Sequence, residues 1–325
     1  MTSKAFGLAQ LGNAYSDGAL SNRNLIINGA MQVAQRGTSF TSSGYSLDHW
    51  YIAETGTCTV IQDTADVPAN FKYAMKATTS AASSSVAIYQ PFEAVDYEAF
   101  KNKTVTISFY AKVNATFSGT MFVDVQTGDT ADTLLSGNWA GNDPQFITPT
   151  TSWARYTAII AVGSTNGVRF VLSPSSAQAS GAEYSITGVQ LEAGDTATPF
   201  EHRSYGQELA LCQRYFCKTY EQDVVPGSGS SLGFPGALRQ TSISTTSYLT
   251  IGNWRFPVPM RAVPTVTAYN PRTGVSNGFT GDSGNYTGVG ASAIGQSGVE
   301  LRVAGPLSIG TDVFVSVAAT ASAEL

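Results

Sequence analysis

The feature that most constrains the fold is a series of short apolar stretches separated by turn residues, with no helical period between them. The stretches include TCTVIQ, SVAIYQPF, TVTISFYAKV, GVRFVLSP and YSITGVQLEAG, and Gly, Ser, Asn and Pro stand between them. Strands of this length need a second sheet to cover their apolar side chains. We therefore predict an all-β jelly-roll β-sandwich over this part of the chain.

The stretch TVTISFYAKV shows the strand period most clearly. Every second position holds an apolar side chain, namely Val105, Ile107, Phe109, Ala111 and Val113. Because successive side chains of a strand point to opposite faces, the intervening Thr104, Thr106, Ser108, Tyr110 and Lys112 share the other face. The pattern predicts an antiparallel strand that is buried on one face only.

The opening stretch NLIINGAMQVAQRGTSF places Asn28-Gly29 between two apolar runs, which is a strong signal for a tight turn. The first and last strands of a jelly roll are commonly neighbours. We therefore expect LIINGAMQV to lie beside SITGVQLEAG, far along the chain. A domain closed in this way has a high contact order and folds slowly.

After the sandwich the pattern changes. From Gln207 to Cys217 the apolar residues follow a helical period, which predicts one short helix. The segment EQDVVPGSGSSLGFP is a linker by composition, and alternating stretches such as GVELRVAG return after it. The predicted organisation is an N-terminal arm (1–23), the jelly roll (24–203), a short helix (204–220), a linker (221–235) and a second, C-terminal β-sandwich (236–325).

Charge and cysteine content exclude several classes of protein. Charged residues make up 13% of the chain and the net charge is −5, whereas a nucleic-acid binder needs a basic face. The three cysteines have no disulfide or zinc spacing, so we expect them to be reduced packing residues. We also expect no signal peptide and no membrane span, because no apolar run is long enough.

Two segments resemble parts of catalytic sites, but neither is complete. GDSGN around Ser283 matches the surroundings of the nucleophile in trypsin-like proteases, yet His49 lacks the context of the base that this serine would need. GSGSSLG has no lysine and does not lie between a strand and a helix, so it is not a phosphate-binding loop. We predict that the chain is not an enzyme.

The acidic residues give no clear metal or hydrolase site either. Asp124, Asp129 and Asp132 could suggest Ca²⁺, but their spacing fits no dedicated loop. Asp48-His49-Trp50 is better explained by a turn cap and a core tryptophan. Glu93, Asp96 and Glu98 are typical of a solvated face, and no pair of carboxylates is spaced for glycoside hydrolysis. We predict no metal and no cofactor.

Three motifs, taken in order, resemble a known group of proteins. They are NLIINGAMQVAQRG followed by YSLDHWYI, then ITGVQLEAGDTATPFEHRSYGQELALCQRYF, then RFPVPMRAVPTVTAYN. Together they resemble jelly-roll domains of phage tail fibres and other virion appendages, over most of residues 24–270. The resemblance implies a carbohydrate-binding-like jelly roll, assembly as a homotrimer and a place on the virion after synthesis in the host cytoplasm.

Within such a fibre, three groups of residues receive roles. The arm would bind another virion protein of the tail, baseplate or head through scattered apolar residues: Phe6, Leu8, Leu11, Tyr15 and Leu20. The helix is too short to stand alone, so its stripe would bury against its own sandwich or against two other copies near the threefold axis: Leu209, Cys212, Tyr215 and Phe216. The Gly-rich loop 270–290 would contact a host-surface glycan or other receptor: Arg272, Asn277, Phe279, Asp282, Asn285 and Tyr286.

Two other functions stay open from the sequence. The chain could be a head or baseplate decoration protein, which stabilises the particle without binding a receptor. It could also be a glycan-cleaving spike, although the catalytic carboxylates that such a spike needs are not evident. The abundance of Tyr, Phe, Asn, Ser and Thr suits sugar binding, but it equally suits a β-sandwich core with polar loops.

Overall fold

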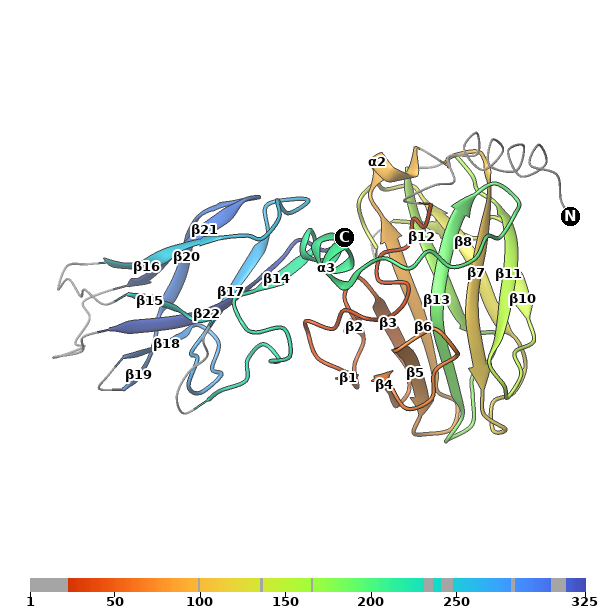
Figure 1. Cartoon of the computed structure of the whole chain (residues 1–325), viewed down its shortest axis with the longest axis horizontal. Coiled ribbons are helices and arrows are strands. Elements are labelled where there is room, and N and C mark those ends of the chain that lie inside the picture. The colour runs from red at the N-terminus through yellow and green to blue at the C-terminus, as the bar shows by residue number, and fades with distance from the viewer. Residues whose placement is uncertain are drawn as a thin grey trace, which may run out of the picture.

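A computed structural model of the chain describes residues 23–98, 100–134, 137–164, 166–230, 236–240, 248–281, 284–304 and 314–325. The described part consists of two β-sandwich bodies side by side, with a short helix between them (Figure 1). Each body has its own cluster of buried apolar side chains. The prediction of an all-β chain with two sandwiches is confirmed.

The first body is built from two antiparallel sheets that face each other. Sheet A contains, in spatial order, β1 (Ser39–Phe40), β4 (Cys58–Asp63), β5 (Ala74–Thr79), β13 (Glu183–Ala193), β7 (Thr104–Val113) and β11 (Ala154–Ala161). Sheet B contains β10 (Gln145–Ile147), β8 (Met121–Gly128), β12 (Gly167–Pro174), β6 (Ser85–Phe92), β3 (Tyr51–Thr55) and β2 (Gly44–Tyr45), with β9 (Trp139–Ala140) also paired to β8. A one-turn helix, α2 (Ala94–Tyr97), follows β6.

Strand β7 departs from its predicted pattern on one face. Its five apolar residues are buried in the core as expected, but Thr106 and Ser108 on the opposite face are buried too. Thr106 Oγ1 donates to the carbonyl oxygen of Gly194 at 2.8 Å, and Arg155 Nη2 donates to Ser108 Oγ at 2.8 Å. Arg155 on β11 also donates to the Thr198 carbonyl, so Arg155 and the chain that leaves β13 together cover the middle of this strand. The residue period alone does not indicate this cover.

The opening segment lies beside the closing strand, as predicted. Leu25 N donates to the carbonyl oxygen of Leu191, and Val189 N donates to that of Gly29, both at 3.0 Å. The side chain of Asn24 adds two bonds to the same strand, donating to the Val189 carbonyl at 3.1 Å and accepting from Leu191 N at 3.1 Å. Side-chain amides thus replace part of a regular ladder, so the segment is extended without being a strand.

The Asn28-Gly29 turn is confirmed, but it does not connect two strands. Asn28 adopts φ 56° and is fully buried. Its side chain bonds both backbone groups of Val33, at 2.8 and 2.9 Å, and its carbonyl accepts from Trp50 Nε1 at 3.0 Å. Asparagine tolerates this left-handed conformation, and its amide satisfies buried backbone groups that would otherwise lack partners.

The helix α3 (Tyr205–Gln213) begins two residues earlier and ends four residues earlier than predicted. Ser204 caps its first turn and forms a capping box with Gln207. The helix ends early because residues 216–218 form β14 (Phe216–Lys218), which pairs with β22 in the second body.

The second body also contains two sheets. One holds β14, β22 (Val315–Ser322), β18 (Gly278–Gly281), β19 (Asn285–Thr287), β15 (Leu238–Gln240) and β17 (Thr265–Tyr269). The other holds β16 (Tyr248–Arg255), β21 (Gly298–Ala304) and β20 (Val289–Gly295). Strand β22 is buried along most of its length and pairs with β14, β15, β17 and β18, so it organises this body.

A buried ionic cluster joins the two bodies, beside α3 (Figure 1). Glu324 lies 2.7 Å from Arg36 Nη2 and 3.1 Å from His49 Nδ1. Asp48 is fully buried next to Arg36 and accepts two hydrogen bonds from Gln35, at 2.5 and 2.7 Å. Gln35 Nε2 also donates to the Phe216 carbonyl at 2.8 Å, which ties the first body to β14. We call this set of residues (35, 36, 48, 49 and 324) the junction cluster.

Most of the predicted trimer stripe is buried at this same junction. Tyr215 stacks on His49 with ring centroids 3.9 Å apart and donates to Glu93 Oε1 at 2.7 Å. The Arg36 guanidinium lies 3.7 Å from the centre of the Phe216 ring, and Cys212 is buried beside them. Leu209 is half-buried. The sequence leaves two partners open for the stripe, its own sandwich and two other copies of the chain, and the structure shows it packed within its own chain. The assignment of Cys212, Tyr215 and Phe216 to a threefold interface is therefore wrong.

Glu93 also differs from its predicted environment. Instead of lying on a solvated face, it is buried and accepts two bonds of 2.8 Å from Arg214 Nε and Nη2. Burial alone would raise the pKa of Glu93, but Arg214 and Tyr215 outweigh burial and the pKa falls below its ordinary 4.5. The three cysteines are buried and free, as expected of packing residues.

We predict that Gly29→Ala destabilises the first body. A Cβ atom at residue 29 would lie 2.2 Å from the Val189 carbonyl oxygen, so the opening segment would have to move away from β13. The free energy of unfolding should fall by about 2–4 kcal/mol, measured by chemical denaturation. The control is Gly206→Ala in α3, where a Cβ meets nothing within 4 Å. Equal stability of the two variants would contradict the role of this contact.

We predict that Glu324→Gln weakens the junction in a pH-dependent way. Burial would raise the pKa of Glu324, but Arg36 and His49 together lower it below the ordinary 4.5. A carboxyl group with a lowered pKa stabilises the fold above its unfolded pKa, and this contribution is lost as the pH falls through the folded value. At pH 7 the variant should lose about 3 kcal/mol.

Thermal unfolding between pH 7 and pH 3 tests this second prediction. The difference between the wild type and Glu324→Gln should shrink as the pH falls below about 4.5, the unfolded pKa. Glu98→Gln is the control, because the Glu98 side chain is 67% exposed in its ion pair with Lys101. A difference that stays constant with pH would mean that the charge of Glu324 contributes nothing.

Candidate functional site

The outer face of sheet B carries a row of aromatic side chains that runs across the strands. Tyr45 on β2 is paired with Tyr51 on β3, and Tyr51 is paired with Tyr89 on β6. The ring centroids are 5.3 Å apart in the first pair and 6.5 Å apart in the second. All three rings point outward because their neighbours Ile52 and Ile88 point into the core, and all three are half-buried.

Arg169 on β12 continues this row. Its guanidinium lies 4.6 Å from the centre of the Tyr89 ring and 4.2 Å from that of Trp139 on β9. Arg169 Nε donates to Gln126 Oε1 at 3.0 Å, and Nη1 donates to the Leu134 carbonyl at 2.8 Å. Burial lowers the pKa of Arg169 below its ordinary 12.5, although an arginine at physiological pH remains charged. We call Tyr45, Tyr51, Tyr89, Arg169 and Trp139 the aromatic row.

Two buried polar atoms on this face have no hydrogen-bond partner among the described residues. They are Trp139 Nε1, a donor, and Asp124 Oδ2, an acceptor. The other oxygen of Asp124 accepts from Val125 N at 2.8 Å. Burial raises the pKa of Asp124 above its ordinary 3.8, so its neutral form is favoured relative to a solvated aspartate.

The chemistry of the row suits a ligand with both apolar and polar faces. A half-exposed aromatic ring offers a flat apolar surface, and the guanidinium and the Gln126 amide offer planar hydrogen-bonding groups. Binding sites commonly combine such apolar surfaces with a few placed polar groups. Phe122 and Phe146 form a second aromatic pair farther along the same face, with centroids 5.8 Å apart and Phe146 61% exposed.

The sequence did not single out the aromatic row as a site. Its members come from five strands between residues 44 and 174, and each fits an ordinary strand pattern. The usable signal was a Tyr at an outward position in both YIAET and SVAIYQPF, with Arg at an outward position in GVRFVLSP. Only the strand order brings these positions together.

The predicted receptor loop is a small hairpin of β18 and β19. Phe279 is 1% exposed and belongs to the core of the second body, where it stacks on Tyr286 at 5.0 Å. It points inward because β18 pairs with β22 over that core. The expectation that Phe279 is an exposed platform is therefore wrong.

The other predicted loop residues are placed as follows. Arg272 Nη1 donates to the Gly281 carbonyl at 3.2 Å, and Asn285 accepts from the buried Asn270 at 3.1 Å. Asn277 is exposed and has φ 58°. Asp282 lies outside the described residues, as do the arm residues Phe6, Leu8, Leu11, Tyr15 and Leu20. A binding role for these residues stays a prediction.

The aspartates considered for calcium accept hydrogen bonds from different parts of the chain. Asp129 accepts from Asn138 N and Nδ2, at 3.0 and 2.8 Å, and Asp132 accepts from Ala94 N at 2.8 Å. Within the described ranges, no group of three or more His, Cys, Asp or Glu side chains is arranged to hold a metal ion. His49 is buried against Glu324, and Ser283 lies outside the described residues.

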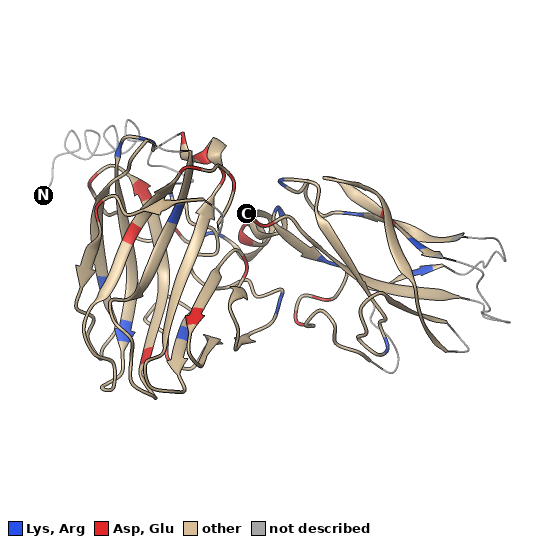
Figure 2. Cartoon of the chain, turned by 180° about the vertical axis from the view of Figure 1, so that it is seen from behind, with Lys and Arg blue, Asp and Glu red and all other residues tan. Residues whose placement is uncertain are grey.

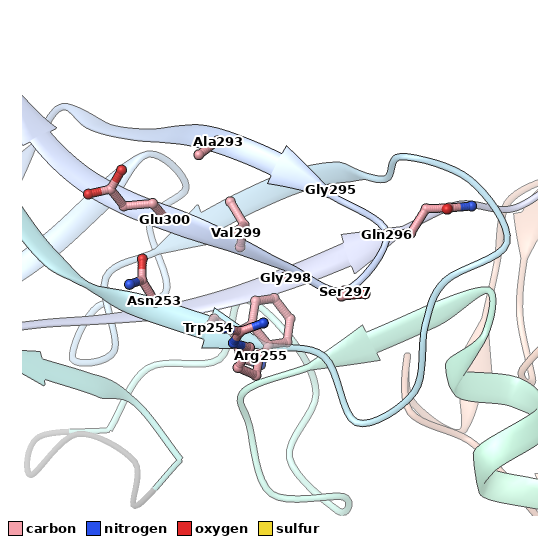
Figure 3. A pocket seen from close by; sticks show the side chains of 10 residues that line it. All are labelled: Asn253, Trp254, Arg255, Ala293, Gly295, Gln296, Ser297, Gly298, Val299 and Glu300. Carbon is pink, nitrogen blue, oxygen red and sulfur yellow. The ribbon is translucent and has the colours of Figure 1, made fainter.

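A shallow hollow of about 490 Å³ opens in the second body between β16 and the β20–β21 hairpin. Figure 3 shows its side chains spread along the strands rather than converging on one point. Glu300 accepts hydrogen bonds from Arg302 Nη2 at 2.5 Å and from Thr250 Oγ1 at 2.8 Å. The Trp254 ring packs edge-on against Phe256. This hollow offers fewer convergent groups than the aromatic row does.

Charged residues are scattered over the strands rather than gathered in one patch (Figure 2). In the part of the chain that the structure describes, no helix has the length and apolar character needed to cross a membrane.

No protein-family model matches the sequence, and no curated protein matches it either. Solved structures do resemble part of the chain. Tailspike protein 4 of bacteriophage CBA120, described as an enzymatically active domain, shares 18% identity over 53% of this chain and 22% of its own, with a TM-score of 0.38. This chain thus matches less than a quarter of that tailspike structure.

Carbohydrate-binding modules resemble the same share of the chain. The CBM22-1 xylan-binding domain of Paenibacillus barcinonensis Xyn10C has 15% identity over 50% of this chain and 100% of its own, with a TM-score of 0.32. The C-terminal family 22 module of Clostridium thermocellum Xyn10B has 15% identity over 52% and 100%, with a TM-score of 0.33. At these sequence identities and TM-scores, the modules resemble this chain in general fold only. The ligands of those modules are therefore not assigned to this chain here.

Proposed function

We propose that this chain is a glycan-binding structural protein of a phage particle, a trimeric tail fibre, and that the aromatic row is its sugar-binding face. The observation that carries the proposal is the row itself. Three tyrosines in cross-strand register, with Arg169 and Trp139 in continuation, lie half-exposed on the outer face of a sandwich.

Packing of the core does not account for this row. The core of the first body lies between the two sheets and is filled by side chains of the opposite strand parity. An outer sheet face is normally polar, so aligned aromatic rings there leave apolar area open to water. A ligand that covers the rings would remove this area from water. Tyrosine loses little conformational freedom in doing so, because its side chain has two rotatable angles.

The place of the protein on a virion is supported by sequence alone. The ordered motifs NLIINGAMQVAQRG, ITGVQLEAGDTATPFEHRSYGQ and RFPVPMRAVPTVTAYN resemble those of phage tail-fibre proteins. Three copies would present three sugar-binding faces, and multivalency turns weak single-site affinity into firm attachment. The trimer would use surfaces other than the buried stripe of α3 and β14. A head or baseplate decoration protein is the second candidate, and its test is given below.

The proposal includes no catalytic step. Glycoside hydrolysis by the common mechanisms uses two carboxyl groups that flank the substrate, whereas Asp124, on the outward side of β8, is fully buried. The row binds and orients a saccharide, and the ligand leaves unchanged.

We predict that Tyr51→Ala and Tyr89→Ala weaken glycan binding. Each substitution removes one ring of the row but no core contact, so affinity should fall about tenfold per ring while the fold is kept. The measurement is a glycan array with the purified chain, followed by titration calorimetry on the best ligand. Tyr205→Ala is the matched control, because Tyr205 is 46% exposed and lies on α3 and not on a strand of sheet B. Unchanged binding by both row variants would refute the proposal.

The same variants separate a fibre from a decoration protein. Phage that carry Tyr51→Ala with Tyr89→Ala should adsorb more slowly to host cells if the chain is a fibre. A decoration protein would leave adsorption unchanged, and its removal would instead lower the resistance of the particle to heat or osmotic shock. Negative-stain micrographs with the chain labelled give an independent answer, since a fibre projects and a decoration protein lies flat.

A further inference from the structure

We infer that the saccharide bound by the aromatic row carries a carboxylate, and that Arg169 holds this carboxylate. The inference rests on the proposed function, because it names the class of sugar that the same site takes. It follows from the hydrogen-bonding state of Arg169, from its charge environment and from the geometry of its stack.

Arg169 has unused hydrogen-bond donors. A guanidinium has five N–H groups. Gln126 takes the one on Nε and the Leu134 carbonyl takes one of the two on Nη1. Nη2 donates to no described residue, so three N–H groups on the two terminal nitrogens have no acceptor in the part of the chain that the structure describes.

The charge of Arg169 is also uncompensated. Three other arginines of the first body and its junction pair with carboxylates: Arg36 with Glu324, Arg203 with Glu208 and Arg214 with Glu93. Among the described residues, no carboxylate oxygen lies within 4.0 Å of Arg169. Asp124 is its diagonal neighbour in the sheet, since Gln126 pairs with Arg169 and Asp124 with Val171. Asp124 forms no ion pair with Arg169, and its Oδ1 instead accepts from Val125 N at 2.8 Å.

An anionic ligand would supply what the site lacks. A half-buried cation without a counter-charge is costly in a medium of low dielectric constant, and an anion that reaches it recovers part of this cost. The two polar partners of Arg169 are a neutral amide and a neutral carbonyl, which orient the guanidinium but do not neutralise it.

The stack favours a carboxylate within the anionic groups. Tyr89 and Trp139 each lie against the guanidinium, at 4.6 and 4.2 Å, and limit its rotation. A fixed planar fork pairs best with a planar group that accepts two parallel N–H bonds, as a carboxylate does. A uronate or sialate unit whose ring lies on Tyr89 would bring its carboxylate beside Arg169.

The test compares acidic glycans with their methyl esters. The panel consists of oligogalacturonate, alginate oligomers, hyaluronan oligomers and sialyllactose, each as the free acid and as the methyl ester, together with neutral oligosaccharides. Esterification removes the charge and nearly keeps the shape. The full chain should bind at least one free acid about tenfold or more tightly than its ester, the size expected of a charge-assisted bond.

Substitution of Arg169 should remove this preference. In Arg169→Gln the ratio of acid to ester affinity should fall to near one, and in Arg169→Lys it should be intermediate, because lysine keeps the charge without the fork. The ratio does not depend on how much of a variant is folded, so partial unfolding cannot imitate the result. Arg155→Gln is the control: Arg155 lies on sheet A, bonded to Ser108 and without a carboxylate partner among the described residues, and its loss should leave the ratio unchanged.

The outcomes distinguish the two levels of the proposal. If the chain binds neutral glycans or esters as well as acids, and Tyr51→Ala weakens the binding of both, the row binds sugar but the carboxylate inference is wrong. If the acid preference survives Arg169→Gln, another cation makes the contact and the inference is again wrong. If no glycan of the panel or of a general array binds, or if binding ignores Tyr51 and Tyr89, the proposed function itself fails.

Discussion

The pairing of residues 24–29 with β13 closes the first body and positions the elements that follow it. It joins the start of the first body to its last strand, so the sandwich is closed only when about 160 residues between them have folded, an arrangement of high contact order. The contact leaves no room for a side chain at Gly29, and it relies on the amide of Asn24 where backbone pairing stops. Asn28 then extends the contact, because its N–H donates to Glu208 of α3 at 2.5 Å.

The helix α3 connects this region of the first body to the second body. The chain passes from the helix into β14, and the junction cluster fixes β14 and the end of β22 against the first body. A chain with only 13% charged residues places several of them here, out of water. Buried ion pairs add little net stability compared with apolar packing, but they are demanding in geometry, so they specify one arrangement of the two bodies. Tyr45 belongs to both regions, since it begins the aromatic row and donates to the Leu325 carbonyl at 2.9 Å.

The aromatic row shows how a binding face can arise from strand register. Its residues span positions 45 to 169 and contact one another only because β2, β3, β6, β12, β8 and β9 follow in that spatial order. A shift of one residue in any of these pairings would turn a ring of the row into the core and an apolar residue outward. The row is therefore as rigid as the sheet that carries it, and rigid aromatic contacts lose little entropy when a ligand binds.

Sequence patterns alone predict the all-β character, most strand positions, the Asn28-Gly29 turn and the contact of the opening segment with SITGVQLEAG. The first three follow from local signals, namely a period of two and turn residues, and the last follows from the rule that the first and last strands of a jelly roll are commonly neighbours. Tertiary structure decided which faces are covered. The period of β7 cannot reveal that the chain after β13 buries Thr106 and Ser108, nor can the apolar pattern of the helix choose between a partner chain and its own junction. The sequence also does not show that Phe279 faces a core. Nor does it show that Tyr51, Tyr89 and Arg169 lie together on an outer face. Burial and cross-strand contact depend on which strands become neighbours, and that is settled by contacts between residues far apart in the chain.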